Sequence, residues 1–452
     1  MKYLLSSRFS KIMIAVALAL PLAGVAQIEK VSYMRPSYWR PYDQTGINVF
    51  ESSKQADPVP FDGLRVRFGA GFTQQFQNLK HENKDANDFE GTNRLYPLSS
   101  GFMTAQANLF MDVQLADGIR LNVTTYLSAR HHNEAWVKGG YIQFDKLPFK
   151  GQFWDNLMKI TTIKVGHMEV NYGDAHFRRS DGGHTLYNPF MESYIMDAFA
   201  TEIGGEVFLQ KNGLFGMLGV TNGMIKGNVD SIAESAVADK NNKRSPSIIL
   251  KGGFDKQLTD NVRLRVSGSW YHNSSSAASG LTLYGGDRTG SNYQNVMEKA
   301  PAGAALPAST AIAFSGRLNP GFGKKVDAVM LNGFLKVKGF ELFGTYETAS
   351  GRSKSETTNR TASQYAVDGL YRFGQSENLF LGLRYNSATA ELAGFSKKVE
   401  VNRFAVAGGW FITKNVLLKA ELVNQHYNDF PNADYRSGGK FNGYVIEAAV
   451  GF

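Results

Sequence analysis

From residue 64 to the end of the chain, apolar and polar residues alternate in runs of about ten positions. In the run 64–76, Val66 and Phe68 fall on one side, whereas Arg65 and Arg67 fall on the other. A period of two is typical of a β-strand with one apolar and one polar face. The alternation therefore predicts strands whose two faces meet different surroundings.

Sixteen such runs follow one another, and each is bounded by a turn signal or a polar connection. An even number of strands brings both ends of a closed sheet to the same rim. The predicted strands are 64–76, 101–116, 119–127, 134–146, 160–173, 201–211, 214–227, 245–258, 262–275, 326–337, 340–352, 362–374, 379–393, 398–413, 416–428 and 444–452.

The connections between these strands alternate in length. Tight Asp-Gly and Asn-Gly turns, such as Asp117-Gly118 and Asn212-Gly213, follow even-numbered strands. The long polar connections follow odd-numbered strands and span 81–100, 174–200, 228–244 and 276–325. Short turns at one rim and long loops at the other are typical of outer-membrane barrels, whereas a soluble sandwich or propeller predicts no such order.

The predicted fold is therefore all-β, a transmembrane antiparallel up-and-down β-barrel of about 16 strands. Its short turns would be periplasmic and its long loops extracellular. Lipid cannot hydrogen-bond a backbone, so a sheet within it must close and leave no edge. We expect the barrel to occupy residues 62–452 and to be surrounded by outer-membrane lipid.

The first residues resemble an export signal. Lys2, Arg8 and Lys11 give a basic start, an apolar run covers 12–20, and small residues precede position 27. We expect a signal peptide over 1–26, cleaved to place the mature chain in the bacterial outer membrane. No other apolar stretch approaches the roughly 18 residues of a membrane helix.

Residues 27–61 precede the barrel and contain an aromatic, proline-punctuated stretch at 34–42. Proline at this spacing opposes a regular helix. This periplasmic N-terminal segment would plug the barrel, dock a partner or be disordered; the sequence leaves these alternatives open. The long loop 276–325, with small residues at 302–313, would form a lid or a receptor surface.

Two features resemble a known family. The chain ends on Phe452 after an amphipathic strand, and the segment 164–173 reads Lys-Val-Gly-His-Met-Glu-Val-Asn-Tyr-Gly. Together with the layout, they resemble bacterial outer-membrane porins of the phosphate-selective O and P type and of the Bacteroidetes type. The resemblance implies a passive diffusion channel that is often a homotrimer. A dense arginine ladder is missing, so phosphate selectivity is not implied.

The loop 174–200 is the candidate constriction. It follows the fifth predicted strand and is thus the third connection at the rim of the long loops, the one that folds into the pore of general sixteen-stranded porins. Its apolar Phe190, Met191, Ile195 and Met196 favour packing against the inner wall. Charges of both signs at a narrowing would favour hydrated ions. The alternative is an external loop with solvated charges. The predicted constriction residues are His176, Arg178, Arg179, Asp181, His184 and Glu192.

The alternation also assigns residues to the inner face. Thirteen basic positions against seven acidic ones predict a weak preference for anions. The predicted pore-lining residues include Arg65, Arg67, Arg120, Lys164, Arg263, Arg265, Arg384, Glu341, Asp368 and Glu421.

The sequence carries little that points to other chemistry. It has no Gly-x-Ser-x-Gly motif, so we expect no enzyme, and an outer-membrane hydrolase is the weakest alternative. His131 and His132 are neighbours on a strand end and point apart, so no metal site or cofactor is expected. The net charge of +9 is spread without Lys/Arg blocks, which argues against nucleic acid. The predicted function is a porin for small hydrophilic solutes or ions. The main alternative is a plugged barrel that acts as an interaction or assembly scaffold.

Overall fold

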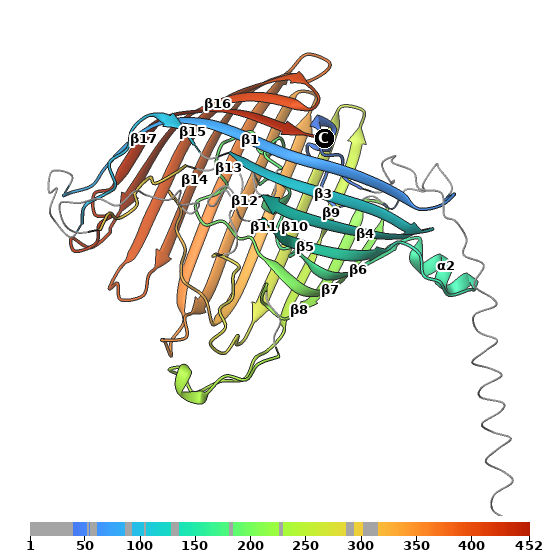
Figure 1. Cartoon of the computed structure of the whole chain (residues 1–452), viewed down its shortest axis with the longest axis horizontal. Coiled ribbons are helices and arrows are strands. Elements are labelled where there is room, and N and C mark those ends of the chain that lie inside the picture. The colour runs from blue at the N-terminus through green and yellow to red at the C-terminus, as the bar shows by residue number, and fades with distance from the viewer. Residues whose placement is uncertain are drawn as a thin grey trace, which may run out of the picture.

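The chain folds into one closed sheet, shown by a computed structural model (Figure 1). The residues that the structure describes are 39–51, 54, 61–85, 93–103, 105–127, 135–179, 184–225, 229–285, 293–301 and 315–452. The predicted signal peptide, 1–26, and most of the segment 27–61 lie outside these residues.

The strands are mostly long and follow one another around the barrel. They are β1 (Arg65–Glu82), β2 (Gly101–Phe102), β3 (Gln106–Ala116), β4 (Ile119–Leu127), β5 (Ala135–Phe144), β6 (Thr161–Glu169), β7 (Thr201–Lys211), β8 (Leu214–Thr221), β9 (Ser247–Thr259), β10 (Val262–Asn273), β11 (Lys325–Val337), β12 (Phe340–Arg352), β13 (Arg360–Phe373), β14 (Leu379–Glu391), β15 (Lys398–Thr413), β16 (Val416–Asn428) and β17 (Lys440–Gly451).

Every neighbouring pair is antiparallel, and β17 pairs with β1 to close the sheet. The short β2 and the longer β3 both pair with β1, so they are two parts of one strand. The barrel therefore has the sixteen strands that the alternation predicts.

The two faces of the wall differ as expected. Outward side chains are apolar and exposed, as at Phe68, which is 62% exposed, and Leu381. Inward neighbours are polar and buried, as at Arg65 and Glu341. An apolar outer surface around a sheet without a free edge fits lipid and not water. The predicted all-β outer-membrane barrel is confirmed.

The connections have the predicted order of lengths. Short turns join β3 to β4, β7 to β8, β9 to β10, β11 to β12, β13 to β14 and β15 to β16. The connection from β5 to β6 lies at the same rim and contains the helix α2 (Gln152–Met158). Figure 1 shows α2 and the C-terminus at one end of the barrel and the long connections at the other. Among the described residues, no helix is long and apolar enough to span a bilayer.

Several predicted strand details are corrected. The strand β1 runs on to Glu82 because it pairs with β17 as far as Lys440. The strand β5 contains a bulge, since Val137 and Gly139 face consecutive residues of β4. The predicted strand 160–173 is shorter in the structure, where β6 covers Thr161–Glu169 and pairs with β7 without a break.

Much of the barrel interior is filled by segments that are not strands. Ile195 and Met196 of the loop 174–200 are fully buried, and their amides donate to Asn386 Oδ1 (2.7 Å) and Gln364 Oε1 (2.9 Å) of the wall. Lys419 Nζ donates to three carbonyls of the same loop. Polar side chains of the wall thus replace water as partners of the loop backbone, which a buried loop requires.

Candidate functional site

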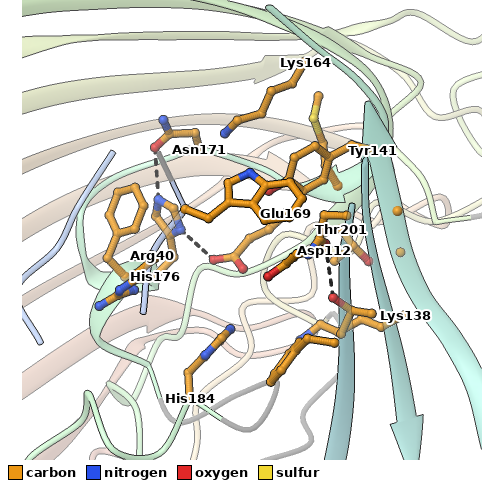
Figure 2. Close-up of a pocket in the computed structure, with 18 of the residues that line it drawn as sticks. Arg40, Asp112, Lys138, Tyr141, Lys164, Glu169, Asn171, His176, His184 and Thr201 are labelled. Carbon is orange, nitrogen blue, oxygen red and sulfur yellow. Dashed lines mark hydrogen bonds and ion pairs between the residues drawn. The ribbon is translucent and has the colours of Figure 1, made fainter. Parts of the chain in front are cut away.

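A cavity of about 220 Å³ remains inside the barrel, beside β1 and β3–β6. The wall contributes Arg67, Phe110, Lys138, Tyr141 and Lys164, among others. The N-terminal segment and the loop 174–200 close the cavity on its other sides. Figure 2 shows the lining side chains around a common space, with Lys164 at one end and His184 at the other. The cavity is the best candidate for a functional site.

The segment 39–51 enters the barrel ahead of β1 and is tightly shaped. A 3-10 turn at Gln44–Gly46 is capped by Asp43, whose carboxylate accepts from the Thr45 amide at 2.9 Å. A Cβ on Gly46 would lie 2.2 Å from the Pro41 carbonyl oxygen, so only glycine fits there. This turn places Trp39, Arg40 and Tyr42 at the cavity.

The far end of the segment is held by charges. Glu51 forms ion pairs with Lys251 Nζ (2.9 Å) and Arg265 Nη2 (2.8 Å), and all three side chains are buried. The same two bases pair with Asp174 at the start of the loop 174–200, at 2.8 and 2.7 Å. Burial raises the pKa of Asp174, but Lys251 and Arg265 outweigh it and hold that pKa well below its ordinary value.

The segment is also fixed at Asn48, which adopts a left-handed backbone conformation with φ 57°. Its Nδ2 donates to Glu341 Oε1 at 2.7 Å, and its Oδ1 accepts from Arg178 Nη1 at 2.6 Å. Asparagine is one of the few residues that tolerate this conformation. Asn48 thus links the segment to both the wall and the loop 174–200.

The acidic groups of the cavity all have basic or polar partners. Asp112 accepts from Arg67 Nε (2.8 Å), from the Tyr42 hydroxyl (2.9 Å) and from Asn122. Glu169 accepts from His176 Nδ1 at 2.6 Å, and His176 Nε2 lies 3.0 Å from Asn171 Oδ1. Little negative charge therefore faces the open space without compensation.

Two donors at the cavity are less well satisfied. The Arg40 guanidinium lies 3.7 Å from the centre of the Tyr187 ring, and its Nε donates to the Gly46 carbonyl at 2.8 Å. Arg40 Nη2 and Trp39 Nε1 are buried without a hydrogen-bond partner among the described residues. Burial lowers the pKa of Arg40, against the attraction of Tyr187 and Glu169.

A row of stacked rings forms one wall of the cavity. Tyr42 stacks on Phe110 with 4.3 Å between ring centres, Phe110 on His184 at 5.2 Å, and His184 on Tyr187 at 5.2 Å. Offset stacking of this kind adds about 0.5–1.5 kcal/mol per pair beyond area burial. Burial raises the pKa of Tyr187 to about 12. The row ties the segment, β3 and the loop 174–200 together.

The predicted constriction residues lie in two places. His176 and His184 line the cavity. Arg178, Arg179 and Glu192 are buried away from it: Arg179 forms two hydrogen bonds with Asp197, and Glu192 pairs with Arg317. Asp181 lies outside the described residues. A role of these residues in a constriction stays a prediction.

The predicted pore-lining residues all point inward, and each has a partner. Arg67 and Lys164 line the cavity; the others pack among the wall, the segment and the loops. The pairs are Arg65 with Asp62, Arg67 with Asp112, Arg120 with Asp145, Lys164 with Glu206, Arg263 with Asp255, Arg265 with Asp174, Arg384 with Asp368, and Glu341 with Arg372, while Glu421 accepts from Tyr293 and the Met191 amide.

Sequence reasoning missed most of the cavity. The residues Trp39, Arg40 and Tyr42 belong to the aromatic, proline-punctuated stretch, which the sequence singles out without giving it a place. Lys138 lies next to the bulge at Gly139. That glycine is the only local feature of the sequence that points to Lys138. Among the described residues, no group of three His, Asp or Glu side chains is arranged to hold a metal ion. His131 and His132 lie outside those residues.

Comparison with known proteins gives likeness of fold. No protein-family model matches the sequence, and no curated protein is significantly similar to it. An anion-selective porin from Comamonas acidovorans is 8% identical, with a TM-score of 0.51 over 86% of this chain and 100% of that one. The outer membrane channel DcaP of Acinetobacter baumannii is 12% identical, with a TM-score of 0.50 over 86% of this chain and 98% of that one. At this identity the likeness shows a shared barrel fold and nothing finer.

Proposed function

We propose that the protein is a passive channel for small hydrophilic solutes in the bacterial outer membrane, with a weak preference for anions. The cavity carries the proposal, because it is a space inside a closed barrel that polar and charged side chains line. An inner wall with no path for solute would be expected to be packed throughout. Here the packing leaves a cavity of about 220 Å³ beside β1 and β3–β6.

The solute path would run along this side of the barrel. The remaining sector is occupied by the loop 174–200, whose backbone is hydrogen-bonded to the wall. The open cross-section is therefore much smaller than the barrel itself. We expect a small conductance compared with that of an unobstructed sixteen-stranded barrel.

The anion preference rests on the charges at the cavity and is weaker than the inner-face count suggests. That count leaves out acids that lie beyond the strands and pair with the wall, such as Glu51, Asp145 and Asp174. At the cavity itself the basic residues are Arg40, Arg67, Lys138 and Lys164, and the acidic residues are Glu51, Asp112 and Glu169. A small positive excess raises the local concentration of anions without excluding cations.

Single-channel recording in planar bilayers tests the proposal. The folded protein should give ohmic steps, and a salt gradient should give a reversal potential of the sign expected for anions. Heat-denatured protein is the control. If correctly folded protein gives no ohmic conductance, the channel proposal is wrong. If the reversal potential has the cation sign, only the anion preference is wrong.

A further inference from the structure

The cavity combines two features that a simple water path does not need. One is Arg40, whose Nη2 is buried and has no hydrogen-bond partner among the described residues. The other is Trp39, whose indole N–H is likewise buried without a partner. Trp39 is more than nine-tenths buried, and both residues line the cavity. Burying a donor without an acceptor is unfavourable, and the penalty is larger when the donor is charged.

We propose that the cavity is a binding site for a small organic carboxylate with an apolar body. The inference rests on the proposed function, since such a solute would bind on its way through the barrel. The carboxylate would accept hydrogen bonds from Arg40 Nη2 and Trp39 Nε1. The apolar body would lie against the ring-rich wall of the cavity.

The charges around Arg40 favour an anion at this point. Its Nε is used by the Gly46 carbonyl and one face by the Tyr187 ring, whereas Nη2 has no hydrogen-bond partner among the described residues. The nearby carboxylate of Glu169 is bound to His176. Asp112 is bound to Arg67 and Tyr42. Asp112 and Glu169 therefore each have hydrogen-bond partners of their own, whereas Arg40 Nη2 has none among the described residues.

The apolar part of the cavity lining favours a ligand whose body, apart from the carboxylate, is apolar. Tyr42, Phe110, Tyr141 and Phe177 bring aromatic surface to the cavity. A site for inorganic ions needs donors on all sides, but Phe110 and Phe177 provide none and the Tyr42 hydroxyl already donates to Asp112. A cavity of about 150 Å³ lined by apolar groups is able to hold benzene, so about 220 Å³ has room for a molecule of that size with a carboxylate.

Calorimetry on the full chain in detergent micelles, with benzoate as the probe, tests the site without relying on conductance. Benzoate should bind, and acetate, inorganic phosphate and benzyl alcohol should each bind at least about tenfold more weakly. Arg40→Gln should raise the Kd for benzoate about tenfold, and Trp39→Phe, which keeps the ring plane but removes the N–H, about threefold. Lys398→Gln is the matched control, because it removes one positive charge at an exposed position of β15 and should leave the Kd unchanged.

The outcomes separate the site from the channel. Ohmic conductance together with a benzoate Kd that Arg40→Gln does not change would overturn the site and leave the channel. Benzoate binding that both variants weaken, in a protein without conductance, would support the site and overturn the channel. Resistance of Tyr42 and Phe50 to chymotrypsin in both variants shows that the segment 39–51 is still in place. Equal binding of phosphate and benzoate would show an unspecific anion site and would also overturn the inference.

Discussion

The ion pairs of Glu51 should decide whether the N-terminal segment stays inside the barrel. Replacing Glu51 by Gln keeps the shape of the side chain and removes its charge. The side chains of Glu51, Lys251 and Arg265 are 6%, 0% and 1% exposed, so water compensates none of them. We expect Glu51→Gln to release the segment 39–51 from the wall.

The size of the effect follows from the network. Removing one member of a buried ion pair destabilises by about 3–5 kcal/mol. Lys251 and Arg265 keep Asp174 as a partner, at 2.8 and 2.7 Å, so the lower end of this range applies. A loss of about 3 kcal/mol raises the detached population by a factor on the order of 10².

Chymotrypsin digestion of the detergent-folded protein measures that population. Cleavage after Tyr42 or Phe50 requires the segment to leave the barrel, because Phe50 is buried and Tyr42 packs on Phe110. When detachment is fast relative to cleavage, the cleavage rate follows the detached population. The rate should rise about a hundredfold in Glu51→Gln, and the mean channel conductance should rise with it.

Asp62→Asn is the matched control for this experiment. It makes the same carboxylate-to-amide change in an ion pair with Arg65, but Asp62 is 62% exposed. Exposed pairs contribute about 0–1 kcal/mol, so cleavage should rise by about fivefold at most. If Glu51→Gln is cleaved no faster than Asp62→Asn, the ion cluster does not hold the segment, and the reasoning is refuted.

Two further predictions concern the extracellular loops and the wall. Burial, opposed by Ser315 and Arg436, raises the pKa of Glu298 from 4.5 to about 7, so its contribution to stability is present below pH 4.5 and is lost as the pH rises through about 7. Hydrogen exchange at the Tyr96 amide, which donates to the Glu298 carbonyl, should lose protection between about pH 4.5 and pH 7, and Glu298→Gln should remove this loss. Gly166→Ala should lower the unfolding temperature seen by heat-shifted gel mobility, because φ is 154° and a Cβ would lie 2.3 Å from the Gly140 carbonyl; Gly268→Ala, whose Cβ meets only Leu331 at 3.4 Å, should have little effect.

The sequence predicts the barrel well because a membrane wall has a simple rule. Each strand residue meets either lipid or the interior, so alternation alone places Phe68 outside and Arg65 inside. The Asp-Gly and Asn-Gly turns then show which rim of the barrel carries the short connections. Strand ends are harder to predict, since β1 continues past residue 76 only because β17 is there to pair with it. That pairing joins residues far apart in sequence.

The cavity was predicted only in part for a related reason. The alternation shows that Arg265 faces inward but not what it meets there. Its partners Glu51 and Asp174 lie outside the strands and come close only in the folded chain. The inner-face count treated such bases as free to attract anions, whereas most of those that the structure describes pair with acids, some on neighbouring strands and some outside the strands. Among the predicted constriction residues that the structure describes, His176 and His184 alone reach the cavity.

The seam between β1 and β17 has a consequence for assembly. Gly71 pairs with Gly451, so the last hydrogen bonds of the wall join the two ends of the polypeptide. Pairing of such distant residues is slow, and both strand edges stay open until the final strand arrives. The segment 39–51 precedes β1 in the chain and lies inside the barrel. It is therefore enclosed as the sheet curls shut, and a tail added at the amino end would have to be accommodated before that last step.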